Sequence, residues 1–157
     1  MSVDAHLTNQ QAIKSIILAD DDIDDHDFFR EALNEIAPSI KLTIVNNGDE
    51  LLNLLNHYIP DFIFLDLDMP CKNGLQCLTE IRANQQIKSI PVVIFSSTSR
   101  PANIETAYEM GADLFFIKPS VYNELISSIK AILELNWQNP SRVKEEYFIN
   151  GRYVAFM

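Results

Sequence analysis

The chain has 157 residues, the size of one domain, and with 47% hydrophobic residues it can bury a sizeable core. Its formal net charge of -10 disfavours nucleic-acid binding, because the overall field of the protein would repel phosphates. No apolar run approaches the roughly 18 residues of a membrane-spanning helix, and residues 1–12 are polar rather than signal-like, so we expect a cytoplasmic protein with no membrane partner. The two cysteines, Cys71 and Cys77, are too few for a disulfide framework or a structural zinc site.

Short apolar runs alternate with helix-like stretches along the chain. The predicted strands cover residues 15–19, 41–45, 62–65, 92–95 and 114–117. The predicted helices cover residues 23–36, 49–57, 75–83, 101–110 and 121–135. Strands that are apolar throughout and alternate with helices indicate an α/β fold: a five-stranded parallel sheet, doubly wound, with helices on both faces.

The composition divides the chain into a polar extension (1–12), a main domain (13–137) and a C-terminal tail (138–157). Asn139-Pro140-Ser141 is expected to break the last helix, and Asn150-Gly151 between aromatic and β-branched residues predicts a β-hairpin within residues 147–156. An isolated hairpin is marginal in water. We therefore expect it to pack on the domain, to pair with a second chain as a homodimer, or to stay partly disordered.

Polar residues follow four of the predicted strands. Asp20 and Asp21 follow the first, Asp66 the third, Ser96 the fourth and Lys118 the fifth. Sites in open α/β sheets form at the carboxyl ends of the strands, so we expect these side chains at one edge. Clustered carboxylates repel one another unless a cation lies among them, and oxygen ligands select a hard ion such as Mg²⁺. An aspartate is also a known phosphoryl acceptor, and a lysine and a hydroxyl would help to neutralise a phosphoryl group.

Each piece also has a structural interpretation. Asp20 to Asp22 suit a solvated helix start, and an isolated Lys118 would be a surface lysine. A helix start is the preferred interpretation for four aspartates, Asp22, Asp24, Asp25 and Asp27. The functional hypothesis depends on the strand ends acting together.

A calcium loop is an alternative. Asp20, Asp22, Asp24 and Glu31 occupy the first, third, fifth and twelfth positions of an EF-hand-like loop. Asp25 stands where that loop needs glycine, and a strand rather than a helix precedes it, which argues against this interpretation.

The motifs resemble those of the response-regulator receiver family, of the stand-alone, CheY-like type. The resemblance covers about residues 15–135 and rests on five segments in the family's order: Ile17 to Asp22, Leu65 to Pro70, Asn73 to Leu75, Val93 to Ser97 and Phe116 to Pro119. It implies that Asp66 is the phosphoacceptor. It also implies that Asp21 binds Mg²⁺ directly, that Asp20 acts largely through water, and that the backbone carbonyl of Asp68 is a third protein ligand.

The resemblance assigns further roles around the acceptor. Ser96 matches the hydroxyl residue that turns towards the phosphoryl group, although threonine is commoner there, and Lys118 matches the lysine that contacts it. Phe115 occupies the aromatic switch position, where it lacks the hydroxyl of a tyrosine, and is expected to rotate inward after phosphorylation. Pro119 follows a peptide bond that is often cis in the family, and Gly74 matches the glycine after the active-site loop.

The function implied is that of a two-component phosphorelay receiver. It would accept a phosphoryl group from a histidine kinase or a histidine phosphotransfer protein and signal to an unknown downstream protein. It would not be an enzyme, but a self-phosphorylating switch with slow autodephosphorylation. The residues after Leu135 are too few for an output domain, so none is expected.

Two other functions remain as alternatives. Asp66-Leu67-Asp68 also resembles the nucleophile motif of haloacid-dehalogenase phosphohydrolases, but in those enzymes the acidic pair follows the nucleophile, whereas here it precedes it. A pure interaction module would not need the complete set of Asp20, Asp21, Asp66, Ser96 and Lys118.

Overall fold

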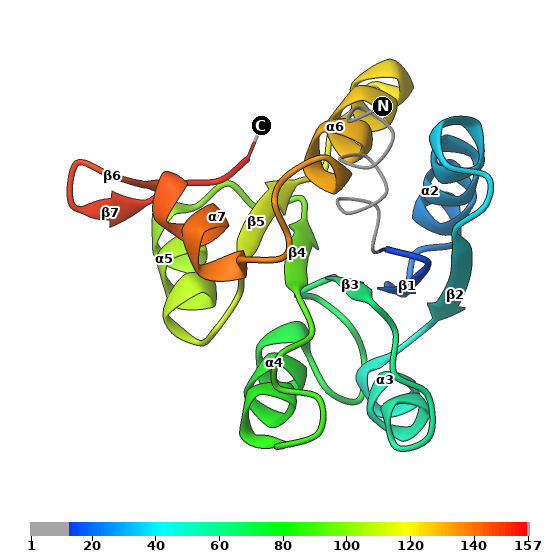
Figure 1. Cartoon of the computed structure of the whole chain (residues 1–157), viewed down its shortest axis with the longest axis horizontal. Helices are drawn as coiled ribbons and strands as arrows, with labels where there is room; N and C mark the ends of the chain where they lie inside the picture. The colour runs from blue at the N-terminus through cyan, green and yellow to red at the C-terminus, as the bar shows by residue number, and fades with distance from the viewer. Residues whose placement is uncertain (1–12, 157) are drawn as a thin grey trace, which may run out of the picture.

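The computed structural model of the chain describes residues 13–156 (Figure 1). Five parallel strands form one sheet in the order β2-β1-β3-β4-β5. Their bounds are β1 (Ser15–Ala19), β2 (Lys41–Val45), β3 (Phe62–Leu65), β4 (Val92–Ser96) and β5 (Leu114–Ile117). The predicted strands are confirmed, and β4 is one residue longer than expected because Ser96 still pairs with Ile117.

The helices that connect the strands are also confirmed. They are α2 (Ile23–Ile36), α3 (Gly48–Leu55), α4 (Gly74–Ala83), α5 (Pro101–Glu109) and α6 (Tyr122–Leu133). Local capping explains where two of them begin. The Asp22 side chain accepts hydrogen bonds from the backbone N–H groups of Asp24 and Asp25, and Asn73 forms a capping box with Gln76.

The helices cover the sheet in two layers, with α2 and α6 on one face and α3, α4 and α5 on the other (Figure 1). Alternate residues of each strand point to opposite faces. In β1, Ile16 and Leu18 join the apolar cluster beneath α2 and α6, whereas Ile17 and Ala19 join the cluster on the other side. The doubly wound arrangement predicted from the sequence is therefore present, with a core on each face.

The tail contains the predicted hairpin, formed by β6 (Phe148–Ile149) and β7 (Arg152–Tyr153). Asn150 and Gly151 have φ angles of 54° and 80°, the left-handed pair that a two-residue Asn-Gly turn requires. One element was not predicted. Pro140 begins a further short helix, α7 (Pro140–Glu146), after the break that ends α6.

The hairpin packs on its own domain, the first of the three arrangements considered. The rings of Tyr108 in α5 and Tyr153 in β7 stack with centroids 4.6 Å apart. The Tyr108 hydroxyl accepts a hydrogen bond from the backbone N–H of Phe115 (3.0 Å) and donates one to the carbonyl of Val154 (2.9 Å). Phe156 then pairs with Phe116 as a parallel bridge along the outer side of β5. The tail thus contacts both α5 and β5.

No helix within residues 13–156 has both the length and the apolar character needed to cross a bilayer.

Candidate functional site

The carboxyl ends of β1, β3, β4 and β5 bring the predicted polar residues to one edge of the sheet. Backbone hydrogen bonds fix their relative positions: Asp66 N–H donates to Ala19 O (2.9 Å), and Lys118 N–H donates to Ser96 O (2.8 Å). Each residue lies at or directly after the end of its strand, so the sheet register alone makes them neighbours.

Three carboxylates form the acidic part of the site. Asp20, Asp21 and Asp66 each offer an oxygen, and these atoms all lie within 4.8 Å of one another. Asp20 is fully buried and Asp66 is 5% exposed, whereas Asp21 lies at the surface. Asp20 Oδ2 accepts no well-formed hydrogen bond within the described part of the chain, although it lies 2.9 Å from Lys118 Nζ. Three carboxylate oxygens this close together, two of them from buried residues, fit a hard divalent cation such as Mg²⁺.

Lys118 supplies the positive charge beside these carboxylates. Its Nζ atom lies 2.7 Å from Asp25 Oδ2, 2.9 Å from Asp20 Oδ2 and 3.6 Å from Asp66 Oδ2. It also lies 5.1 Å from the centroid of the Phe95 ring. The lysine is therefore held within the acidic cluster and does not extend into solvent.

Burial dominates the electrostatics of the acidic pair. It raises the pKa of Asp66 to about 7, with Lys118 lowering that pKa and the nearby charge of Asp20 raising it. Burial likewise raises the pKa of Asp20, against the backbone N–H of Asp22 and the charge of Lys118. Burial lowers the pKa of Lys118, but contacts with Asp25, Asp66 and Asp20 outweigh it, so that this pKa is raised overall. Two buried carboxylates share one lysine, and a divalent cation would add the missing positive charge.

Ser96 and Gly74 shape the space around Asp66. Ser96 is fully buried, and its Oγ accepts a hydrogen bond from the backbone N–H of Thr98 (3.2 Å), at the start of the loop to α5. Gly74 begins α4 against the end of β3, where an added Cβ would lie 2.3 Å from the Asp66 carbonyl oxygen. The side chain of Asp68 is exposed. Its backbone carbonyl as a metal ligand stays a prediction.

Two expectations from the resemblance differ from the structure. Phe115 is already fully buried, in the apolar cluster on the α5 side of the sheet, so an inward rotation from an exposed position is not available to it. Tyr153 and Ala155 of the tail pack against that same cluster. The peptide bonds of residues 13–156 are all trans, including the bond between Lys118 and Pro119.

Asp25 is the residue at the site that the sequence did not single out. Asp22 is the helix cap that was expected, but the Asp25 side chain turns to Lys118. His26 was also missed: it is buried, and its Nε2 lies within hydrogen-bonding distance of the Asp20 carbonyl. No sequence signal marks Asp25, because an aspartate in the first turn of a helix already has a local explanation. The sequence around His26 carries no motif that marks it either.

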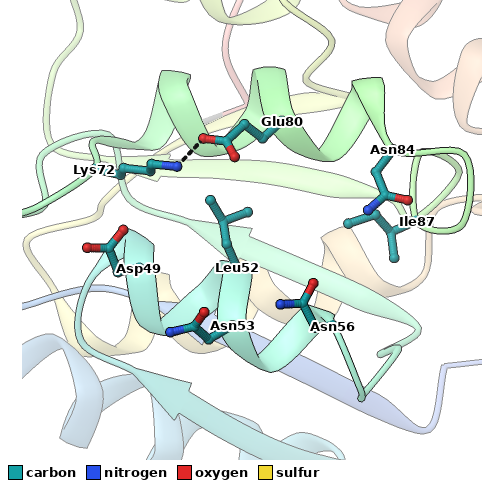
Figure 2. A pocket seen from close by; sticks show the side chains of 8 residues that line it. All are labelled: Asp49, Leu52, Asn53, Asn56, Lys72, Glu80, Asn84 and Ile87. Atoms are coloured by element: carbon teal, nitrogen blue, oxygen red, sulfur yellow. Dashed lines mark hydrogen bonds and ion pairs between the residues drawn. The ribbon is translucent and has the colours of Figure 1, made fainter.

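A groove of about 410 Å³ lies between α3 and α4 (Figure 2). Lys72, in the loop before α4, forms an ion pair with Glu80 on the α4 side of the groove, and Asp49, Asn53 and Asn84 also line it. None of the residues predicted for the site lines it.

Comparison with known proteins gives a consistent result. Residues 16–130 match the family model described as response regulator receiver domain. The chain is 33% identical over 113 residues to the nitrate/nitrite response regulator protein NarL of Escherichia coli K12, covering 68% of this chain and 50% of NarL. A similar match to the probable transcriptional regulator ycf29 of Pyropia yezoensis is 33% identical over 98 residues, covering 62% of this chain and 44% of that protein. The chain thus spans about half the length of these curated relatives.

Solved structures agree with this match. The phosphorylated cyanobacterial phytochrome response regulator RcpA has a TM-score of 0.73 at 29% identity, covering 80% of this chain and 94% of RcpA. The Mn²⁺-bound response regulator Rcp1 has a TM-score of 0.70 at 27% identity, covering 76% of this chain and 91% of Rcp1.

Proposed function

Because this chain belongs to the response regulator receiver domain family, whose members are phosphoacceptor switches of two-component signalling, we propose that Asp66 is its phosphoacceptor. The observation that carries the proposal is the cluster of Asp20, Asp21 and Asp66 within 4.8 Å, with the Lys118 ammonium 3.6 Å from Asp66. The phosphodonor would be a histidine kinase or a histidine phosphotransfer protein in the cytoplasm. The output would be a change in protein–protein contacts with a downstream partner.

The proposed metal is Mg²⁺, held by Asp20, Asp21, Asp66 and the backbone carbonyl of Asp68. When bound, it neutralises negative charge on the phosphoryl oxygens and the carboxylates. The similar response regulator Rcp1 has been solved in a Mn²⁺-bound form, which supports the proposal that this chain also binds a divalent ion.

The chain's own residues carry the transfer. An oxygen of the Asp66 carboxylate attacks the phosphorus of the phosphohistidine, the new O–P bond forms as the N–P bond breaks, and the imidazole leaves with the electron pair. Lys118 donates a hydrogen bond to one phosphoryl oxygen. The Ser96 hydroxyl turns away from the Thr98 backbone N–H and donates to a second phosphoryl oxygen. This movement shifts the loop that leads into α5.

The output would pass through α5 rather than through a rotation of Phe115. Ser96 begins the loop that ends at α5, and Tyr108 of α5 holds both Phe115 and Val154 by its hydroxyl. A shift of that loop would therefore reach the outer face of α5 and the tail. A partner that prefers the shifted face would bind the phosphorylated protein better.

The test is phosphorylation with Mg²⁺ and acetyl phosphate, followed by intact mass. We expect wild type to gain one phosphoryl group and Asp66→Asn to gain none. Asp49→Asn, an exposed aspartate in α3, is the matched control and should behave like wild type. Phosphoryl transfer to Asp66→Asn, or steady release of phosphate over many turnovers, would contradict the proposal.

A further inference from the structure

The ammonium group of Lys118 is closer to Asp25 than to the proposed acceptor. The Lys118 Nζ to Asp25 Oδ2 distance is 2.7 Å, and the distance to Asp66 Oδ2 is 3.6 Å, beyond a normal hydrogen bond. Asp25 comes from the first turn of α2 rather than from a strand end. It is 93 residues from Lys118 in the sequence, so the contact joins α2 to the loop after β5.

Asp25 also differs from the other two carboxylates around Lys118 in its surroundings. Asp20 and Asp66 belong to the group of oxygens within 4.8 Å that fits a divalent cation, whereas Asp25 does not. A bound cation would neutralise much of the charge of Asp20 and Asp66, so Asp25 would remain as the carboxylate that attracts Lys118. The Asp25 side chain is 28% exposed, so water can solvate it when the lysine departs.

From these contacts we propose that Asp25 is a positioning residue that holds Lys118 away from Asp66 and gives it up to a phosphoryl group formed there. This inference rests on the proposed function of Asp66. To bind Lys118, a phosphoryl oxygen must displace Asp25. The phosphorylated state is therefore stabilised only by the difference in free energy between the Lys118–phosphoryl contact and the Lys118–Asp25 contact. Asp25 therefore lowers the occupancy of that state, and removing its charge raises it.

The experiment compares Asp25→Asn with Asp24→Asn in the full chain. Both variants remove one negative charge from the first turn of α2, but Asp24 is exposed and its side chain does not contact Lys118. Beryllium fluoride with Mg²⁺ serves as the phosphoryl analogue, and its dissociation constant is measured by calorimetry. We expect Asp25→Asn to bind it about fivefold more tightly, the size of one partly exposed ion pair, and Asp24→Asn to change by less than about twofold. The fraction phosphorylated by acetyl phosphate should follow the same order.

Two further variants separate positioning from a structural role. Asp25→Glu keeps a carboxylate within reach of Lys118 and should bind the analogue like wild type. In a Lys118→Met background, Asp25→Asn should have no larger effect than Asp24→Asn, because the pair it breaks is already gone. Circular dichroism and Mg²⁺ affinity, which should match between the two Asn variants, report whether the fold and the cation site are intact.

The outcomes distinguish this inference from the function beneath it. If wild type binds the analogue and Asp25→Asn is no tighter than Asp24→Asn, or is weaker, Asp25 does not restrain Lys118. If wild type neither binds the analogue nor takes a phosphoryl group, the proposed function of Asp66 fails first.

Discussion

Gly74 determines how closely α4 approaches the end of β3. A Cβ at this position would lie 2.3 Å from the Asp66 carbonyl oxygen and 2.8 Å from the Leu67 Cα, and both neighbours are backbone atoms that cannot move aside independently. We expect Gly74→Ala to lower the free energy of unfolding by about 1 to 3 kcal/mol, as overpacking does. Denaturant unfolding measures this.

The same substitution should also disturb the acceptor, because the clash is with its own backbone. Slower phosphorylation by acetyl phosphate is expected under native conditions. Thr79→Ala, at an exposed position of the same helix, should stay within about 0.5 kcal/mol of wild type. Equal stability of Gly74→Ala and wild type would show that the backbone at Asp66 and Leu67 can move to accommodate the added methyl group.

Single residues differ in how well the sequence predicted them. Asp66, Ser96 and Lys118 could be placed together because each closes a strand of a parallel sheet, and the register brings such ends to one edge. Asp25 could not be assigned to the site from the sequence, because its distance from Lys118 depends on how α2 packs. The full burial of Phe115 also depends on tertiary packing, because it lies in a cluster against which tail residues pack.

At the scale of elements, Tyr108 is the link between α5, β5 and the tail. Its hydroxyl bonds both the Phe115 N–H and the Val154 carbonyl, so Tyr108→Phe leaves a buried donor and an acceptor without a partner. We expect a loss of about 1 to 3 kcal/mol in the free energy of unfolding. Chemical denaturation followed by far-UV circular dichroism provides the measurement.

A second tyrosine supplies the control. The Tyr58 hydroxyl is buried and has no hydrogen-bond partner among residues 13–156, so Tyr58→Phe removes an oxygen that makes no bond there. It should be neutral or slightly stabilising. A similar loss in both variants would mean that the two hydrogen bonds of Tyr108 add little.

The elements of the sheet were predictable, whereas those of the tail were only partly so. Strands buried on both faces give continuous apolar runs, and an Asn-Gly pair is typical of a two-residue hairpin turn. Both features are therefore recognisable in the sequence. The helix α7 is short and buries mainly Val143, which is too little periodicity to predict a helix. Its place is set by contacts such as that from Lys144 Nζ to the Tyr108 carbonyl (2.8 Å).

For the whole molecule, the acidic edge predicts that Mg²⁺ stabilises the fold. An ion that binds the native state alone adds about 2.7 kcal/mol at one hundred times its dissociation constant, or about 5 to 10 °C in Tm for a domain of this size. Thermal unfolding with Mg²⁺, against sodium chloride at equal ionic strength, tests this. Chelation should reverse the shift.

Asp21→Asn provides the matched variant, since this carboxylate belongs to the cluster but is exposed. Without Mg²⁺, the Tm of this variant should be near that of wild type. With Mg²⁺, most of the Tm increase seen in wild type should be lost. A shift of the same size in both proteins would place the ion elsewhere on a chain whose net charge is -10.

Among the described residues, the pairing of Phe156 with β5 covers part of one edge of the main sheet and leaves the β2 edge unpaired. Phe156 N–H donates to the Phe115 carbonyl (2.7 Å), while β2, at the other end of the strand order, has no strand on its outer side among the described residues. A sheet bare on both sides can be extended by copy after copy into a filament. Because Phe156 occupies part of the β5 edge, joining through β2 would favour a pair of molecules over a growing filament.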